Sequence, residues 1–171
     1  MSREELPLNS QDGKVRVLMV CLGNICRSPT AHGVFQQRIE ARNLGDRILV
    51  DSAGTGSWHI GSAPDRRSAR AAAARGYRLD ELVARQVDDG DFYQFDYLLA
   101  MDHDNLADLQ AQRPHNCDCR IELFLDYSEG EERAVPDPYN SGPDGFELVL
   151  DMVEETCDRL LDTLVSRHLV D

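Results

Sequence analysis

The sequence predicts a single α/β domain, a doubly wound four-stranded parallel sheet flanked by helices, from three observations. Short apolar segments alternate four times with helical patterns along the 171 residues, as in a chain built from βαβ units. The first apolar segment, residues 14–20, is almost continuous, as is typical of a central parallel strand. It leads into a loop at the carboxyl end of that strand, where sheets of this kind bind ligands.

Length and composition agree with one domain. A chain of 171 residues with 42% hydrophobic residues can bury one sizeable core. Residues 1–13 are expected to be a flexible leader, and residues 14–171 the folded domain. The leader lacks the apolar core and cleavage site of a signal peptide, and no apolar run is long enough to span a bilayer. We therefore expect no membrane association.

Cysteine usage indicates a reducing compartment. The chain has five cysteines, an odd number, and Cys21 and Cys26 are too close in a proposed tight loop for an ordinary disulfide framework. A soluble, cytoplasmic protein is therefore expected. Nothing in the sequence sets the oligomeric state, for which a monomer is the simplest expectation.

The charge of the chain restricts its partners. A formal net charge of −13 argues against nucleic acid, which requires a basic surface. Any phosphate site must therefore depend on local positive charge. A run of arginines could add to that charge or could simply form a solvated helix face: Arg66, Arg67, Arg70 and Arg75.

The first half of the chain predicts one βαβ unit. After the strand at residues 14–20, a helix is expected to open at Pro29, because proline suits a first helical turn. Apolar residues then recur at helical spacing: Ala31, Val34, Phe35 and Ile39. Gly45 is expected to end this helix soon after Asn43. Residues 48–50 form a second short strand, which closes a right-handed unit.

A loop rich in glycine and serine follows, over residues 52–65, and it carries the only tryptophan. Residues 65–75 are rich in alanine and predict a helix that stops at Gly76. Residues 80–95 show no clear pattern, so no element is assigned there.

The last part of the chain continues the alternation. Residues 97–101 predict the third strand, and Asp102 can cap a helix that runs to about Gln112. Residues 120–125 predict the fourth strand. From Phe146 onward, apolar residues at helical spacing predict a long amphipathic last helix.

The loop after the first strand has the chemistry of a phosphate site with a thiol at its floor. A cysteine attacks as the thiolate, which an ordinary free thiol seldom forms at neutral pH. The backbone amides of residues 22–27, the guanidinium of Arg27, the hydroxyl of Ser28 and the helix N-terminus would all stabilise the anion. The same groups would hold a phosphate dianion above Cys21, and the planar fork of Arg27 can bind two phosphoryl oxygens.

Two further residues of this loop suit a backbone with inward-pointing amides. Gly23 and Asn24 are of the residue types that tolerate the positive φ such a loop must visit. The ordered combination of cysteine, glycine, asparagine, arginine, serine and proline makes a merely structural cysteine in a βα turn a poor alternative.

Together these residues form the segment CLGNICRSPT, which resembles the signature of the low-molecular-weight protein tyrosine phosphatases. The segments DSAGTGSWHIGSAPD, FDYLLAMDHDNLADL and VPDPYNSG resemble that family in their usual order. The similarity extends from about Val15 to the last helix. It implies the phosphotyrosine protein phosphatase I-like fold and a hydrolase that uses no metal and no cofactor. Its substrates would be tyrosine-phosphorylated proteins, and also aryl phosphates.

The resemblance also implies a mechanism. Cys21 would be the nucleophile that forms a phosphocysteine, Arg27 would bind the phosphoryl group, and Asp137 would act as general acid and then as general base. Asp137 lies between Pro136 and Pro138, which hold it on a stiff loop. Composition alone would make this segment a turn-rich connector, so the catalytic role depends on its pairing with the cysteine loop.

Weaker assignments complete the expected site. The phosphate-binding loop would contribute Leu22, Gly23, Asn24, Ile25, Cys26 and Ser28. Trp58 and Tyr139 would wall the substrate pocket, although each could instead be an ordinary core or surface residue. The family pattern implies that Asn24, Ser28 and Ser52 support the loop, with the Ser52 hydroxyl bonded to the side-chain amide of Asn24.

The remaining cysteines and histidines are given lesser roles. Cys26 could form a reversible disulfide with Cys21 that makes the enzyme redox-sensitive, or it could be a small buried side chain. Cys117 and Cys119 are too close for a usual zinc pair and are taken as structural. No histidine is assigned to catalysis.

Departures from the family pattern leave alternatives open. His32 stands where glutamate is usual, Arg75 where histidine is common, and Asn140 replaces a second tyrosine, which makes the pocket wall less aromatic. A protein-arginine phosphatase has the same scaffold but tends to carry threonine where this chain has Ile25. An arsenate reductase would need two further downstream cysteines, and an inactive phosphotyrosine-binding module would not need the nucleophile, arginine and acid together.

Overall fold

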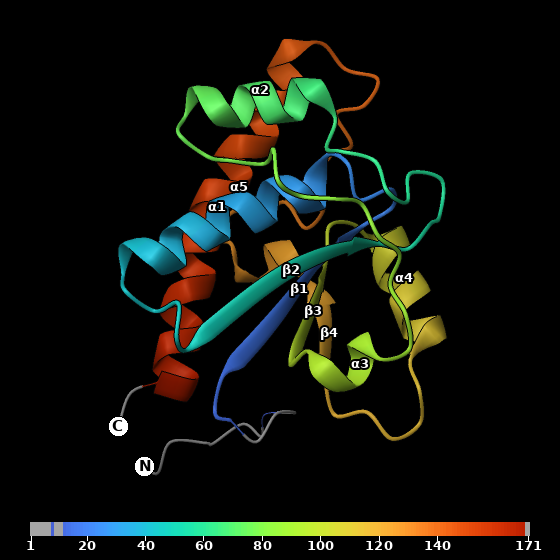
Figure 1. Ribbon diagram of the computed structural model, residues 1–171, viewed down its shortest axis with the longest axis vertical. Helices are drawn as coiled ribbons and strands as arrows, with labels where there is room; N and C mark the ends of the chain where they lie inside the picture. Colours follow the sequence, from blue (N-terminus) through green and yellow to red (C-terminus); the bar gives the residue numbers. More distant parts are fainter. Residues whose placement is uncertain (1–7, 9–11, 170–171) are drawn as a thin grey trace.

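The computed structural model describes residue 8 and residues 12–169, and it confirms the predicted fold (Figure 1). The sheet has four parallel strands in the order β2-β1-β3-β4. Their bounds are Val15–Cys21 for β1, Ile48–Gly54 for β2, Tyr97–Ala100 for β3 and Arg120–Leu123 for β4. After β1 the chain adds β2 on one side of it, and then β3 and β4 on the other side. The strand order therefore reverses at β1, and in such sheets ligands bind at the carboxyl end of the strands at this point.

Alternate residues of β1 face two different layers of the core. Val17, Met19 and Cys21 pack with helices α1, Arg27–Ala41, and α5, Pro143–Leu164. Leu18 and Val20 pack on the other face with residues of α3, Asp91–Gln94, and α4, His103–Gln112. Figure 1 shows α1 and α5 on one side of the sheet and α3 and α4 on the other. Burial on both faces accounts for the continuous apolar pattern of this strand.

Helix α1 begins earlier and ends differently than the sequence predicts. It starts at Arg27, two residues before Pro29. Proline is tolerated there because the amides of the first turn have no partner within the helix, and the Thr30 amide makes the first bond, to the Cys26 carbonyl at 3.2 Å. Asn43, not Gly45, ends the helix: its φ of 57° is left-handed, and the Leu44 amide bonds the Ile39 carbonyl at 3.0 Å.

The middle of the chain contains a longer strand and a short helix. β2 runs four residues past the predicted end, to Gly54. Helix α2, Arg66–Ala74, is capped by Asp65, whose side chain accepts from the Arg67 amide at 2.8 Å, and Gly76 follows with φ of 90°. The stop at Gly76 agrees with the prediction, whereas Asp65 caps the helix instead of belonging to it. Residues 80–95, for which the sequence predicts no element, contain only α3 and a bridge to Gly54.

The second half of the sheet differs from the prediction only at element ends. Asp102 caps α4, since its Oδ1 accepts from the Asn105 amide at 2.8 Å. β4 ends two residues early because Phe124–Tyr127 turns into a 3₁₀ helix. α5 begins at Pro143 rather than Phe146, as proline at a helix start permits. A π-helical turn, Val165–Leu169, follows α5.

Some residues of the predicted leader contact the domain. Leu8 is half-buried against the core layer that contains α1 and α5, and Asp12 forms an ion pair with Arg16 at 2.9 Å. The rest of that prediction, for residues 1–7 and 9–11, lies outside the described residues. Among the helices that the structure describes, none has the length and apolar character needed to cross a bilayer.

Candidate active site

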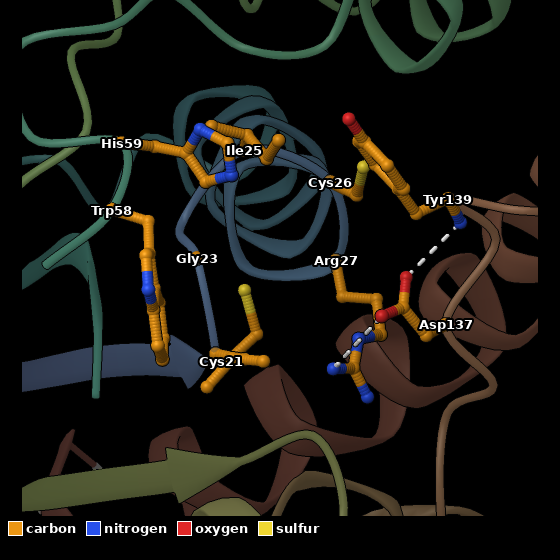
Figure 2. Close-up of a pocket in the computed structure, with 10 residues that line it drawn as sticks. Cys21, Gly23, Ile25, Cys26, Arg27, Trp58, His59, Asp137 and Tyr139 are labelled. Carbon is orange, nitrogen blue, oxygen red and sulfur yellow. Dashed lines mark hydrogen bonds and ion pairs between the residues drawn. The ribbon is translucent and has the colours of Figure 1, made fainter. Parts of the chain in front are cut away.

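The thiol of Cys21 lies at the end of β1, enclosed by the loop that leads into α1 (Figure 2). The residue is 3% exposed. Its Sγ lies 3.0 Å from the Ser28 hydroxyl and accepts from the Asn24 amide at 3.3 Å. Both contacts and the N-terminus of α1 favour negative charge on the sulfur.

Asn24 fixes the shape of this loop. Its φ of 57° is left-handed, as the sequence predicts. Its side-chain amide donates to the Ser28 hydroxyl at 2.8 Å, and its carbonyl oxygen accepts from the Arg85 amide at 3.1 Å. The expectation that Gly23 also has a positive φ is wrong. A Cβ at Gly23 would lie 2.9 Å from Cδ2 of His59, so a larger residue there would require the His59 ring to shift.

The backbone of the loop presents its amides and turns its carbonyls away. Within the described part of the chain, the amides of Gly23, Ile25 and Cys26 donate to no protein acceptor. The loop carbonyls are bonded from outside: Cys21 by the Thr55 amide at 2.9 Å, Leu22 by the Gly56 amide at 2.9 Å, and Ile25 by the Asp65 amide at 2.8 Å. Unpaired amides on one loop form a binding site for an anion.

Close contact with the end of β2 holds that backbone in place. A Cβ at Gly54 would lie 2.6 Å from the Leu22 carbonyl oxygen and 3.2 Å from the Asn24 nitrogen. Only glycine allows the two backbones to approach so closely. Gly54 therefore supports the loop, although the sequence alone gives it no such role.

Arg27 is buried and held by two residues far away in the chain. Its Nη1 donates to Oδ2 of Asp102 at 2.6 Å and to the carbonyl of Val135 at 3.0 Å. Its Nη2 lies 3.9 Å from Oδ2 of Asp137. Because Nη1 is fully used by the protein, the guanidinium has one orientation, with Nη2 on the side of the pocket.

Asp137 approaches the cysteine loop from the segment before α5. Its side chain is 53% exposed, and its Oδ1 accepts from the Tyr139 amide at 3.0 Å. A pocket of about 220 Å³ connects this carboxylate with the thiol. It is lined by Cys21, Leu22, Gly23, Ile25, Cys26, Arg27, Trp58, His59, Asp137 and Tyr139.

Two aromatic side chains border this pocket. Figure 2 shows Trp58 and Tyr139 on opposite sides of Cys21. They are 73% and 46% exposed, which is unusual for large rings and suits a binding surface. The Trp58 ring lies against Gly56, where a Cβ would come within 2.0 Å of Cζ3.

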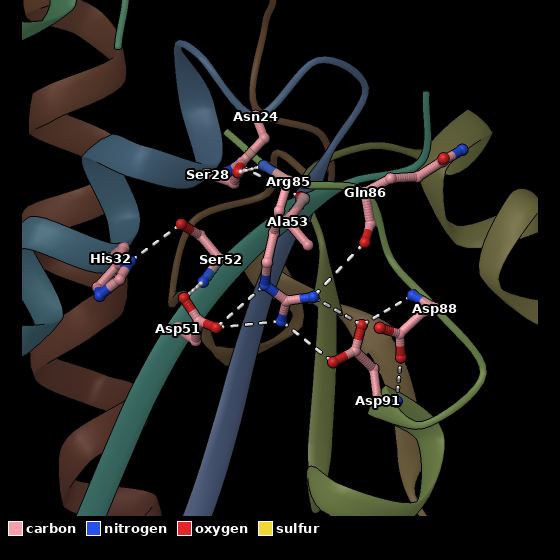
Figure 3. A network of polar contacts seen from close by, with 10 residues as sticks. All are labelled: Asn24, Ser28, His32, Asp51, Ser52, Ala53, Arg85, Gln86, Asp88 and Asp91. Carbon is pink, nitrogen blue, oxygen red and sulfur yellow. Dashed lines mark hydrogen bonds and ion pairs between the residues drawn. The ribbon is translucent and has the colours of Figure 1, made fainter. Parts of the chain in front are cut away.

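The predicted bond between Ser52 and Asn24 is wrong. The Ser52 hydroxyl instead lies 2.9 Å from Nδ1 of His32, the residue that departs from the family pattern. Loop support passes through Arg85 (Figure 3). Its guanidinium bonds Asp51 and the buried Asp91 at 3.0 to 3.2 Å, while its amide holds Asn24.

The other cysteines are all free and buried. Burial raises the pKa of the Cys26 thiol to about 12, although a hydrogen bond with Ser68 opposes the shift. Cys26 is thus a neutral thiol at neutral pH. The Sγ atoms of Cys117 and Cys119 lie 3.1 Å apart in the loop before β4. Among the described residues, no three histidine, cysteine or acidic side chains are grouped as a metal site would require.

Sequence reasoning missed several residues of this site. Asp102 is expected only as a helix cap, yet its second oxygen binds Arg27. Gly54 and Arg85 act through backbone contacts that no local pattern reveals. His59 lines the pocket beside Trp58. For Asp102 the available signal is its position directly after the predicted third strand, since the carboxyl ends of parallel strands meet at the ligand site.

Comparison with known proteins gives this geometry a family. Residues 16–169 match the family described as low molecular weight phosphotyrosine protein phosphatase. The low molecular weight protein-tyrosine-phosphatase YfkJ of Bacillus subtilis is 39% identical over 151 residues, which span 88% of this chain and 96% of that protein.

Solved structures agree with that match. A protein tyrosine phosphatase from Entamoeba histolytica, in a product state mimic, is 38% identical with a TM-score of 0.85, and the match covers 92% of this chain and 100% of the other. The Drosophila arginine phosphatase is 36% identical with a TM-score of 0.81, over 86% and 96% of the two chains. This chain belongs to the low-molecular-weight protein tyrosine phosphatase family.

Proposed function

We propose that this protein hydrolyses phosphotyrosine in proteins through a phosphocysteine on Cys21. In the first step the Cys21 thiolate attacks phosphorus, the bond from phosphorus to the phenolic oxygen breaks, and Asp137 donates its proton to that oxygen. The observation that carries the proposal is the single pocket that contains the buried Cys21 thiol, Arg27 and Asp137.

The second step regenerates the enzyme. Asp137, now a carboxylate, removes a proton from a water molecule, and the water oxygen attacks phosphorus. The bond from sulfur to phosphorus breaks, which releases inorganic phosphate and the Cys21 thiolate. Oδ2 of Asp137 lies on the pocket side, 3.9 Å from Nη2 of Arg27. One carboxylate can therefore serve as acid in one step and as base in the next.

Positive charge from the protein would stabilise the phosphoryl group in both steps. Arg27 Nη2 and the free amides of Gly23, Ile25 and Cys26 are fixed before substrate binds. Groups that need no reorganisation stabilise transition-state charge most strongly. The neutral Ser28 hydroxyl, at 3.0 Å from Sγ, can donate to the thiolate when it forms and when it leaves.

The shape of the pocket favours an aryl phosphate. The thiol lies at its floor and two aromatic side chains, Trp58 and Tyr139, stand at its rim. A phenyl ring is long enough to reach the floor between them, whereas the short side chain of phosphoserine is not. Synthetic aryl phosphates should therefore also be substrates.

A protein-arginine phosphatase is the second candidate, because the Drosophila arginine phosphatase has the same fold. Ile25 lines the pocket of this chain and supports the tyrosine assignment, since an apolar side chain suits a phenyl ring better than a guanidinium. Matched peptides with phosphotyrosine or phosphoarginine decide between the two. We expect the higher kcat/KM for phosphotyrosine, and the reverse order would replace the assignment.

A reducing, cytoplasmic location and a monomeric state complete the proposal. The reaction requires Cys21 as a free thiolate, and the neighbouring pocket residue Cys26 is a second thiol that an oxidising compartment would expose to bridging. Fractionation of cells and sedimentation of the purified protein test these two points.

Two variants test the roles of the central residues. Cys21→Ser should abolish turnover, with Cys117→Ser as the matched control at a thiol outside the pocket. Asp137→Asn should reduce kcat/KM, which reports the first step, by about 10²- to 10⁴-fold for phosphotyrosine, the usual contribution of a general acid. That loss should be larger for phosphotyrosine than for nitrophenyl phosphate, whose leaving group needs no proton.

The outcomes separate the two assignments. Full activity in Cys21→Ser would refute the phosphocysteine mechanism. Equal losses for the two substrates in Asp137→Asn would refute only the role of Asp137 as the acid. Asp144→Asn, a change of the same kind in the first turn of α5, controls for the loss of one negative charge.

A further inference from the structure

Helix α2 carries two arginines whose charge no described residue neutralises. Arg66 and Arg70 are exposed, and neither forms an ion pair within the described part of the chain. They are four positions apart on one face of the helix, where like charges repel. The chain has 31 acidic residues and a net charge of −13, so this unpaired positive pair stands out from its surroundings.

A groove lies beside Arg70, between α2 and the start of α5, two elements that lie next to each other in Figure 1. Its volume is about 350 Å³. Arg70 is at its rim, and much of the lining is apolar, with Ala71, Ala74, Pro143 and Phe146. It can therefore accept the aliphatic part of a side chain while a guanidinium meets the polar end.

The groove and the active-site pocket share a wall. The guanidinium of Arg67 lies 5.3 Å from the ring centre of Tyr139, which lines the pocket, and 4.7 Å from that of Phe146, which lines the groove. Arg67 itself is paired with Asp65 at 3.0 Å. Arg67 thus lies between the two sites. Arg70 lines the groove and has no ion-pair partner among the described residues.

One carboxylate, that of Glu147, also lines the groove, and it is paired with an arginine. Oε1 of Glu147 accepts from Nη2 of Arg75 at 2.8 Å. Arg75 also pairs with Asp151 and Glu154, at 2.9 and 2.6 Å. These contacts hold Glu147 toward Arg75, and among the described residues that line the groove Arg70 is the charged side chain without an ion-pair partner.

We propose that this groove binds an aspartate or glutamate side chain of the protein substrate, close in sequence to its phosphotyrosine, with Arg70 as the selecting residue. The proposal rests on the proposed function, because the phosphotyrosine must occupy the adjoining pocket. A carboxylate can form a charge-assisted hydrogen bond with Arg70. The strongly negative chain repels acidic peptides elsewhere, so this surface would decide which of them are accepted.

A double-mutant cycle between peptide and enzyme tests the proposal. Phosphotyrosine peptides carry a single glutamate at successive positions on either side of the phosphotyrosine, and matched peptides carry glutamine there. The ratio of kcat/KM for the two peptides is measured with wild type, Arg70→Gln and Arg47→Gln. Arg47 is an exposed arginine at the opposite end of β2, so its variant loses the same charge far from the groove.

At the best position we expect glutamate to raise wild-type kcat/KM by about threefold to fivefold over glutamine, the range of an exposed ion pair. The ratio should fall to near unity in Arg70→Gln, remain in Arg47→Gln, and decrease as salt is added. A ratio near unity at every position with wild type would overturn the proposal. So would a preference that survives in Arg70→Gln, or one that falls equally in Arg47→Gln.

Nitrophenyl phosphate, which is too small to reach the groove, distinguishes a failure of the proposed function from a failure of the groove as a docking site. If wild type does not hydrolyse it, the proposed function fails. If wild type hydrolyses it and the glutamate ratio gives one of the contradicting results, only the acidic docking groove fails.

Discussion

The two halves of the active site are held in different ways. In the cysteine loop, Cys21, Asn24 and Arg27 are 3%, 3% and 4% exposed. The side chains of Asn24 and Arg27 are bonded to distant segments, and that of Cys21 is bonded within the loop. In the acid loop, the side chains of Asp137 and Tyr139 are 53% and 46% exposed. The contacts that position them are one backbone bond, the 3.9 Å approach of Asp137 to Nη2 of Arg27, and the Arg67 guanidinium over the Tyr139 ring.

This difference separates two tasks. Stabilising the charge of a transferring phosphoryl group requires donors that are fixed beforehand, and the buried loop supplies them. Delivering a proton requires a carboxylate at the rim, where leaving groups of different size must fit. Changes in the cysteine loop should therefore reduce both stability and activity, whereas changes in the acid loop should reduce activity alone.

Among the changes that compare the stability and activity of the two loops, Arg27→Lys should have the largest effect. A lysine keeps the charge but cannot hold Asp102, the Val135 carbonyl and a phosphoryl oxygen at once. We expect kcat/KM to fall by about 10²- to 10³-fold, as when a preorganised donor is lost. The free energy of unfolding should fall by about 1–3 kcal/mol because buried partners lose bonds. Steady-state kinetics and urea unfolding measure both, and an unchanged kcat/KM would contradict the role of Arg27.

Gly54→Ala tests the rigidity of the loop without touching a reacting group. The added Cβ would overlap the Leu22 carbonyl oxygen at 2.6 Å, so the loop must shift. We expect a loss of about 1–3 kcal/mol in the free energy of unfolding and a clear fall in kcat. Gly45→Ala, where a Cβ has nothing within 4 Å, is the matched control. Equal free energies of unfolding and equal kcat values for the two variants would show that the loop is not tightly held.

Tyr139→Ala tests the acid loop. It removes an aromatic wall and the ring under Arg67 but little buried area. We expect about a fivefold loss of kcat/KM for aryl substrates, in line with about 1 kcal/mol for an aromatic contact, mainly through KM. The thermal midpoint should stay close to that of wild type. A fall in the midpoint as large as in Gly54→Ala would remove the distinction between the two regions.

The smallest effect concerns His32. Burial lowers its pKa below 6.5, the positive charge of Arg85 lowers it further, and Asp51 opposes both. The unfolded chain therefore binds a proton more readily than the folded protein does, so stability is lost as the pH falls below about 6.5. Unfolding at pH 7 and pH 5 should show a smaller loss for His32→Asn than for wild type. An identical loss in both would exclude His32 as a contributor.

The sequence predicts what depends on neighbouring residues. The apolar run of β1, the cap at Asp102 and the left-handed Asn24 all follow from residue type and spacing, and all are present. The residue that ends a helix is harder to predict, because more than one nearby residue can adopt the required conformation. Asn43 and Gly45 can both adopt the left-handed conformation, and Asn43 is the one that does.

Contacts between distant segments were not predictable in the same way. The oxygen of Asp102 that binds Arg27 belongs to a residue 75 positions away, and the close approach of Gly54 to Leu22 depends on how β2 meets the loop. The predicted Ser52–Asn24 bond failed for a related reason. His32, which replaces the usual glutamate, lies within 2.9 Å of the Ser52 hydroxyl and takes that bond.

The most direct test of the mechanism is to trap the intermediate. Asp137→Asn is mixed with nitrophenyl phosphate, whose leaving group departs without a proton, and is quenched in acid within one turnover. Peptide mass spectrometry should then find one phosphoryl group on Cys21, because the variant forms the phosphocysteine but lacks the base that hydrolyses it. Turnover without any phosphorylated Cys21, or with the phosphoryl group on another residue, would contradict the account.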